Sequence, residues 1–219
     1  MNPTIKLALI LIASLEISFT YNLPANLLVI LISVTYLFYH RIHGKTLAWL
    51  VIVPIIPAFG LFTTIYFFSS QHDLATASAL FTRMYAYVFA GASFSLTTKP
   101  LDLAHSLEQN CHLPSKFAYG TLAAFNMLPK IKQTIVTIKS AAAMRGVNLS
   151  WWSPHLYFKA ILVAINWSEN LAMAMISHGF VEDQPRSAYE LVQVKARDIT
   201  WMVGLLIVLQ VPIVWQIMN

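Results

Sequence analysis

Apolar residues gather in four long runs within the first 96 residues of the chain and in one more run at its C-terminal end. The runs cover residues 4–21, 23–39, 47–68, 75–96 and 199–217. Each is close to the ~20 residues that an α-helix needs to cross ~30 Å of hydrocarbon. Pro54, Pro57 and Gly60 lie inside the third run and predict a kink there, because proline removes a backbone hydrogen bond. The pattern predicts an all-α fold, a polytopic membrane protein with about five transmembrane helices.

Residues 97–198 follow a different pattern, too polar for the hydrocarbon and too apolar for an ordinary soluble loop. Prolines stand at or just before the start of four stretches with helical spacing: Pro100, Pro114, Pro129 and Pro154. Gly146 ends the stretch that begins at Pro129, and Gly179 ends the one that begins at Pro154. Proline at a helix start and glycine just past its end are the usual punctuation. We therefore expect three regions: transmembrane helices in residues 1–96, helices outside the hydrocarbon in 97–198, and a last transmembrane helix in 199–219.

The charge distribution sets the predicted orientation of these regions. Hydrophobic residues make up 58% of the chain and charged residues only 11%, whereas roughly a quarter are charged in soluble domains. Lysine or arginine occurs at Lys6, in residues 40–45 and ten times in residues 97–198, but not in residues 22–23 or 69–73. Because cytoplasmic loops collect these residues, the N-terminus and residues 97–198 are predicted to be cytoplasmic and the C-terminus to face outward. The net charge of +5 fits this topology and contact with the lipid bilayer better than a nucleic-acid partner.

Two charged residues fall inside predicted transmembrane helices, Glu16 in the first and Arg83 in the fourth. At 1.5 Å per residue, Glu16 lies ~18 Å from the inner end of its helix and Arg83 ~10 Å from the outer end of its own. In a ~30 Å core these depths nearly coincide, and pairing would lower the cost of both charges. We expect a structural intramembrane ion pair, with a place in a substrate pathway as the alternative.

Candidate metal ligands are sparse. The single cysteine, Cys111, excludes an internal disulfide and a cysteine-rich metal site. Two loose groups remain, His40 with His43, and His105 with Cys111 and His112. Neither has the acidic or cysteine partners of a convincing site, so we predict no metal site.

Catalytic motifs are also missing from the sequence. It contains no Walker-type glycine loop, no His-Glu-x-x-His and no Gly-x-Ser-x-Gly, so an ATPase, a metalloprotease or a serine hydrolase is unsupported. We predict no catalytic residue. A membrane-embedded enzyme that uses Asp102, His105 and Glu108 is the alternative from another class, and it predicts turnover without partner proteins.

Two similar tripeptides end the two long cytoplasmic stretches: Met144-Arg145-Gly146 and Ser177-His178-Gly179. The ordinary interpretation is that a cation in the last turn favours the helix dipole and that glycine supplies a left-handed cap. The repetition favours a docking device. Arg145 follows Ile131 and Ile138 at seven-residue spacing, so it projects from the apolar stripe, where its planar fork suits a groove on a partner.

Four segments carry a resemblance to a known family: TTKPLDLAHSLEQNCHLP, FNMLPKIKQTIVTIKSAAAMRG, WSENLAMAMISHGF and RSAY. Over residues 95–198 the chain resembles the transmembrane T component of energy-coupling factor (ECF) transporters, the CbiQ/EcfT-like family. The resemblance implies a coupling subunit in a prokaryotic cytoplasmic membrane, which takes part in uptake of a vitamin or a transition-metal ion. Its implied partners are two ATP-binding cassette ATPases, which hold the ATP and magnesium, and a small membrane substrate-binding subunit. No cofactor is expected on this chain.

Two Ala-Arg-Gly motifs in that family place their arginines in grooves on the two ATPases. By position, Arg145 and Gly146 match the first motif, with Met144 in place of its alanine, and Ser177, His178 and Gly179 fall on the second. Histidine replaces the second arginine and lacks its five-donor fork, so we expect Arg145 to carry the stronger contact.

The cargo stays open, because a T component need not touch it. Thiamine precursors, other vitamins, cobalt and nickel all remain candidates. A conventional transport permease is a further alternative, and it would have its own substrate cavity and usually one coupling helix.

Overall fold

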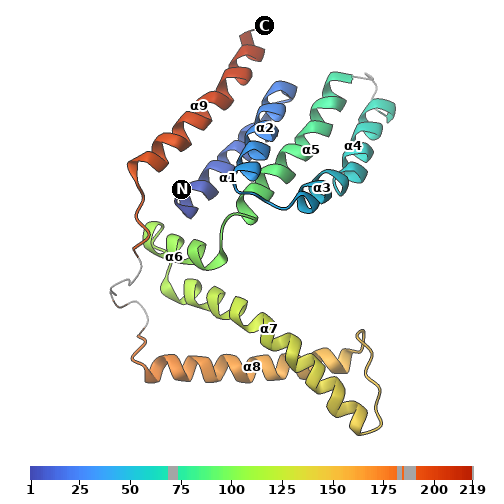
Figure 1. Cartoon of the computed structure of the whole chain (residues 1–219), viewed down its shortest axis with the longest axis vertical. Coiled ribbons are helices and arrows are strands. Elements are labelled where there is room, and N and C mark those ends of the chain that lie inside the picture. Colours follow the sequence, from blue (N-terminus) through green and yellow to red (C-terminus); the bar gives the residue numbers. More distant parts are fainter. Residues whose placement is uncertain (69–73, 182–183, 185–190, 219) are drawn as a thin grey trace. The chain divides into compact units, whose positions relative to one another are not determined.

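The computed structural model describes residues 1–68, 74–181, 184 and 191–218. Within these residues every regular element is an α-helix, so the predicted all-α fold is confirmed. The chain divides into two compact units (Figure 1). Unit 1 contains Met1–Ser106 and Val192–Asn219, and unit 2 contains Leu107–Leu191.

Unit 1 is a helical bundle. Its helices are α1 (Pro3–Phe19), α2 (Leu23–Tyr39), α3 (Gly44–Ile52), α4 (Ile55–Phe68), α5 (Leu74–Ser95) and α9 (Ala196–Met218), and the first turns of α6 (Pro100–Asn110) also belong to it. Helix α5 packs against α1, α2, α3 and α4, while α9 packs against α1 and α2.

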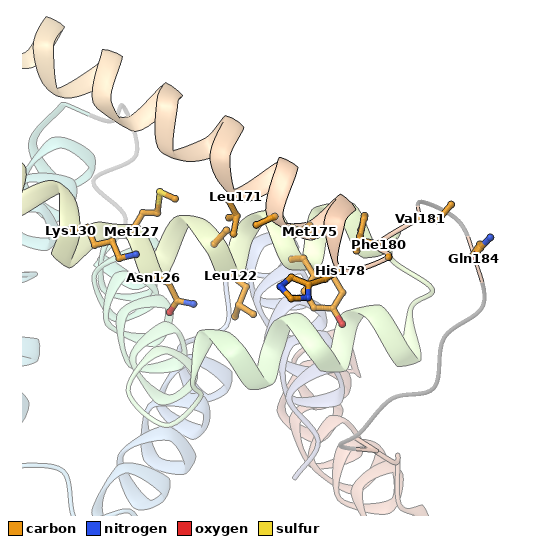
Figure 2. Close-up of a pocket in the computed structure, with 14 residues that line it drawn as sticks. Leu122, Asn126, Met127, Lys130, Leu171, Met175, His178, Phe180, Val181 and Gln184 are labelled. Atoms are coloured by element: carbon orange, nitrogen blue, oxygen red, sulfur yellow. The ribbon is translucent and has the colours of Figure 1, made fainter.

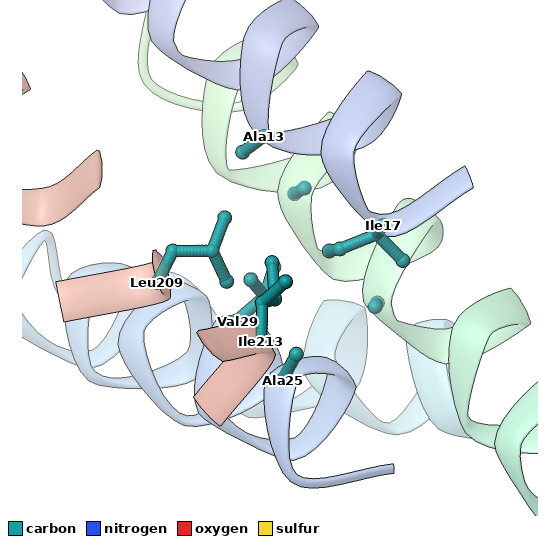
Figure 3. Packing of buried hydrophobic residues seen from close by; sticks show 8 residues of the cluster. Ala13, Ile17, Ala25, Val29, Leu209 and Ile213 are labelled. Carbon is teal, nitrogen blue, oxygen red and sulfur yellow. The ribbon is translucent and has the colours of Figure 1, made fainter. Parts of the chain in front are cut away.

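The core of the bundle is built from small and branched apolar side chains (Figure 3). Its buried members are Ala13, Ile17, Ala25, Val29, Ala86, Ala90, Leu209 and Ile213. Small residues let helix backbones approach closely, which is how helices associate where the surrounding solvent is itself apolar. Large apolar side chains such as Leu11, Leu31 and Phe38 point outward, as expected for a surface that meets lipid.

Polar side chains organise the turn between α1 and α2. The Asn22 side chain caps α2 by accepting a hydrogen bond from the Ala25 N–H at 3.1 Å. Its amide nitrogen also donates to the carbonyl of Pro212 in α9 at 2.6 Å. This single asparagine therefore both starts α2 and ties it to α9.

The predicted kink in the third span is confirmed. Helix α3 ends at Ile52 and α4 begins at Ile55, with Pro54 between them. Pro54 has no N–H to donate to the Leu50 carbonyl. The Tyr85 hydroxyl of α5 donates instead to the neighbouring Val51 carbonyl at 3.1 Å.

In the described residues, three segments are long and apolar enough to cross a membrane: Gly44–Phe67, Pro154–Ser177 and Ala196–Trp215. The first and last belong to the predicted third and fifth spans, and the predicted second span, Leu23–Tyr39, is a shorter apolar helix. The chain is thus an all-α membrane protein. The middle segment is α8, which the charge pattern assigns to the cytoplasm, and that orientation stays a prediction.

Unit 2 consists mainly of α7 (Ser115–Met144) and α8 (Pro154–Ser177), which pack against each other and run in opposite directions (Figure 1). The predicted helix boundary at Pro129 is wrong, because Pro129 lies inside α7, a helix of 30 residues that continues to Met144. A proline removes one backbone hydrogen bond, here to the Phe125 carbonyl, but its backbone angle suits a helix. Since the residues on both sides favour a helix, the chain resumes the same helix. At 1.5 Å per residue, α7 is ~45 Å long and α8 ~36 Å.

Candidate docking tips of the two long helices

Helix α7 ends in a closed cap. Gly146 has a φ of 73°, the left-handed conformation that ends many helices. The Val147 N–H donates to the Ala142 carbonyl and the Gly146 N–H to the Ala143 carbonyl, each at 3.0 Å. These two bonds define a Schellman motif, which satisfies carbonyls that a helix end would otherwise leave without donors.

Helix α8 ends in the same way. Gly179 has a φ of 83°, the Phe180 N–H donates to the Met175 carbonyl, and the Gly179 N–H donates to the Ile176 carbonyl, both at 2.9 Å. The residues just before the two glycines also share a backbone conformation, with φ and ψ of −93° and 10° at Arg145 and of −86° and 11° at His178. The two side chains therefore leave equivalent positions on equivalent caps.

We call residues 144–147 the Arg145 tip and residues 177–180 the His178 tip. All six predicted docking residues are exposed, with Met144 at 84%. Neither the Arg145 side chain nor the His178 side chain has a hydrogen-bond or ion-pair partner among the residues that the structure describes. Both are therefore free to bind another protein.

The two tips lie at opposite ends of the helix pair. Phe180 packs edge-on against Tyr119 near the start of α7, with ring centroids 6.2 Å apart and planes at 86°. Arg145 stands 26 residues after Tyr119, which corresponds to ~39 Å along the helix axis. The two tips are therefore two separate surfaces of unit 2.

An open cavity of about 950 Å³ lies beside the His178 tip, between α7 and α8. Figure 2 shows Leu122 of α7 and His178 of α8 facing this space. The α7 side is lined by residues three or four apart: Tyr119, Leu122, Ala123, Asn126, Met127 and Lys130. This spacing places the residues on one face of α7, which is the part of the cavity that the sequence could have indicated.

The loop after the Arg145 tip is held against α7. The Lys139 ammonium lies over the Trp151 ring, 4.2 Å from its centroid. Trp151 therefore braces the loop, a role that the sequence analysis did not assign, while Trp152 is 90% exposed.

The predicted ion pair between Glu16 and Arg83 is not formed in the described structure. Arg83 Nη2 donates to the Thr20 carbonyl at 2.5 Å, and the guanidinium lies over the Tyr21 ring. Thr20 is the C-terminal cap of α1, so the guanidinium meets the negative end of that helix dipole. Glu16 instead accepts a hydrogen bond from Gln210 in α9 at 2.8 Å.

The fold does not assemble the other candidate catalytic and metal-binding residues into a metal site within the described part of the chain. Asp102, His105 and Glu108 lie together in α6, and Cys111, just after it, is exposed. Among the described residues no three His, Cys, Asp or Glu side chains form a group that could hold a metal ion.

The chain also matches a known protein family. A family model described as CbiQ, cobalt transport protein, matches residues 1–189. The matched range includes the four N-terminal predicted spans and both tips, whereas the resemblance seen in the sequence was confined to residues 95–198.

Proposed function

The chain belongs to the CbiQ family of cobalt transport proteins, and from this premise we propose that it is the transmembrane coupling subunit of an ECF-type importer. In this role it carries no catalytic residue. Two ATP-binding cassette ATPases, which hold ATP and magnesium, bind the Arg145 tip and the His178 tip. A small substrate-binding membrane subunit binds the cargo, a transition-metal ion such as cobalt or nickel, or a vitamin.

The observation that carries the proposal is the pair of matching caps. Two exposed residues with hydrogen-bonding side chains, Arg145 and His178, occupy equivalent positions on helix ends ~39 Å apart. That separation suits two ATPase subunits, each with one groove. When the ATPases close and open on ATP, α7 and α8 carry the movement to the substrate-binding subunit.

The two tips are unequal in chemistry. Arg145 offers five donors in a planar fork, which can bond carbonyls and carboxylates together. His178 offers one or two donors and stands beside an apolar cavity. We infer that Arg145 supplies the stronger polar contact and that the second site depends more on shape.

Co-purification tests the proposal. The tagged chain, expressed with its neighbouring genes, should bring down two ATPase chains and one small hydrophobic protein. Arg145→Ala should weaken ATPase binding more than His178→Ala. Two exposed residues away from the tips, a cation and a histidine, provide controls: Lys132→Ala on α7 and His155→Ala on α8.

Each alternative predicts a different result. A membrane-embedded enzyme would turn over a substrate without partners, and a conventional permease would bind cargo by itself. Equal losses from Arg145→Ala and His178→Ala would refute the inequality of the tips, and unchanged ATPase binding in both would refute docking at these residues.

A further inference from the structure

The first residues of α1 form a dense polar cluster inside unit 1. Asn2 caps the helix by accepting a hydrogen bond from the Thr4 N–H at 3.0 Å, and it is buried. Lys6, one turn later and one of the charges from which the orientation was predicted, is only 7% exposed. Its ammonium donates to the hydroxyls of Thr97 and Thr98, and it lies over the Tyr36 ring.

The point at which the chain leaves unit 1 is bonded to this cluster. Ser106 is the last residue of the first segment of unit 1, and its side chain is 0% exposed. Its hydroxyl lies 2.6 Å from Asn2 Oδ1 and 2.5 Å from the Thr4 hydroxyl, and it accepts a bond from the Thr4 N–H at 3.3 Å. These contacts use every donor and acceptor that a serine hydroxyl has.

The point at which the chain returns is bonded to the same asparagine. Val192 is the first residue of the second segment of unit 1, and its carbonyl accepts a hydrogen bond from Asn2 Nδ2 at 3.4 Å. The Asn2 N–H donates to the Asp198 carboxylate at the start of α9 at 3.2 Å. The N-cap residue of α1 thus bonds the chain at both crossings between the units.

We propose that Asn2, Thr4 and Ser106 are positioning residues for energy coupling, which tie both chain crossings to the start of α1. This inference rests on the proposed function. The chain passes between the two units at residues 106–107 and 191–192, so these crossings are a covalent route by which movement of α7 and α8 can reach the bundle. If the chain were flexible at these crossings, it would bend there and the bundle would not move. Because both crossings are bonded to the start of α1, movement of α7 and α8 passes into α1 and α9.

Asn2→Ser removes the side-chain bonds of Asn2 to Ser106 and Val192 but keeps the helix cap. Serine is a good N-cap, so α1 keeps its first hydrogen bond, but its side chain is too short to reach both Ser106 and Val192. Ser106→Ala should loosen only the departing crossing. Thr4→Val should loosen that crossing too, whereas Thr4→Ser keeps the hydroxyl and should behave as wild type. Ser78→Ala is the matched control, because the half-buried Ser78 hydroxyl donates to the Ala75 carbonyl of its own helix and lies away from the cluster around Asn2.

The first measurement is hydrogen–deuterium exchange on the purified chain in lipid nanodiscs. Asn2→Ser should raise exchange about tenfold at residues 101–107, because these amides then open more often. It should raise exchange less at residues 191–198, because the Asn2 N–H, a backbone group, still donates to Asp198. Ser106→Ala should raise it at 101–107 only. Unchanged exchange at 191–198 in Asn2→Ser would refute the claim that the Asn2 side chain restrains the returning crossing. This test needs no ATPase.

The second measurement uses the assembled complex, nucleotide-free and trapped with magnesium, ATP and vanadate. In the wild type, trapping should change exchange in α7 and α8 and also in α1 and α9. In Asn2→Ser the change in α7 and α8 should persist and the change in α1 and α9 should be reduced, since the backbone bond from Asn2 to Asp198 remains. An undiminished response of α1 and α9 would overturn the proposal. Failure of ATPases to co-purify with the wild-type chain would instead refute the proposed function, from which the coupling role follows.

Discussion

Replacing Gly146 by alanine tests whether the shape of the α7 cap matters for docking. Gly146 has a φ of 73°, a conformation that costs an L-residue with a side chain roughly 1–2 kcal/mol. A Cβ built at this position meets no atom within 4 Å, so the substitution adds no clash. The backbone cost is therefore the whole perturbation, which makes the expected effect calculable.

A cost of about 1–2 kcal/mol lowers the population of the closed cap relative to other helix ends by a factor of about 5–30. If a partner binds only the closed cap, its apparent affinity falls by up to the same factor, because binding must first restore that conformer. Gly179 has a φ of 83° and equally open surroundings, so Gly179→Ala should lower affinity at the other tip by a similar factor. The side chains of Arg145 and His178 are untouched in both variants.

The assay is a titration of the purified chain in nanodiscs with its ATPase subunits, followed by fluorescence anisotropy. Gly146→Asn should fall between wild type and alanine, since asparagine tolerates the left-handed conformation better. Gly120→Ala is the control, because Gly120 lies inside α7 with no atom near its missing Cβ, and alanine should stabilise the helix there by up to ~1 kcal/mol. Wild-type affinity in both Gly146→Ala and Gly179→Ala would refute the argument that the caps present the docking residues.

Two further predictions concern stability, measured by unfolding in detergent micelles. Arg83→Leu should destabilise unit 1 by about 1.5–3 kcal/mol through loss of a charged hydrogen bond to the Thr20 carbonyl. Combined with Glu16→Gln, its effect should be additive within ~0.5 kcal/mol, and a larger coupling energy would show that the two charges do interact. Pro129→Ala should stabilise α7 by up to ~3 kcal/mol, because alanine restores the N–H that can bond the Phe125 carbonyl, and a lower melting temperature would contradict this.

Local features of this protein could be predicted from its sequence. A Schellman cap is closed by residues that lie within six positions of one another, so Gly146 and Gly179 marked both helix ends. The break at Pro54 was predictable for the same reason. The error at Pro129 shows the limit of this reasoning, because a proline can begin a helix or kink one. Only the helical preference of the residues before it decides between these outcomes.

Contacts between distant segments could not be predicted in the same way. Counting residues from the helix ends placed Glu16 and Arg83 at nearly the same depth, and Arg83 indeed binds Thr20, one turn from Glu16. Depth does not fix the direction in which a side chain leaves its helix. That direction depends on how α1, α5 and α9 pack. As a result, Glu16 accepts a hydrogen bond from Gln210, and Arg83 donates to the Thr20 carbonyl at the end of α1.

The polar cluster at the start of α1 is the strongest case of this kind. Asn2 and Ser106 are 104 positions apart, and Asn2 and Val192 are 190 apart. Taken alone, Asn2 is an ordinary N-cap and Lys6 an ordinary flanking charge. A subunit that transmits force needs its moving helices attached firmly to the rest of the fold, and that attachment must be made where the chain passes between the two parts. Two of the three residues proposed to meet this need, Asn2 and Thr4, lie at the beginning of the chain, far in sequence from both tips. The tips are the proposed partner sites, and the cluster around Asn2 is where the resulting movement would enter the membrane bundle.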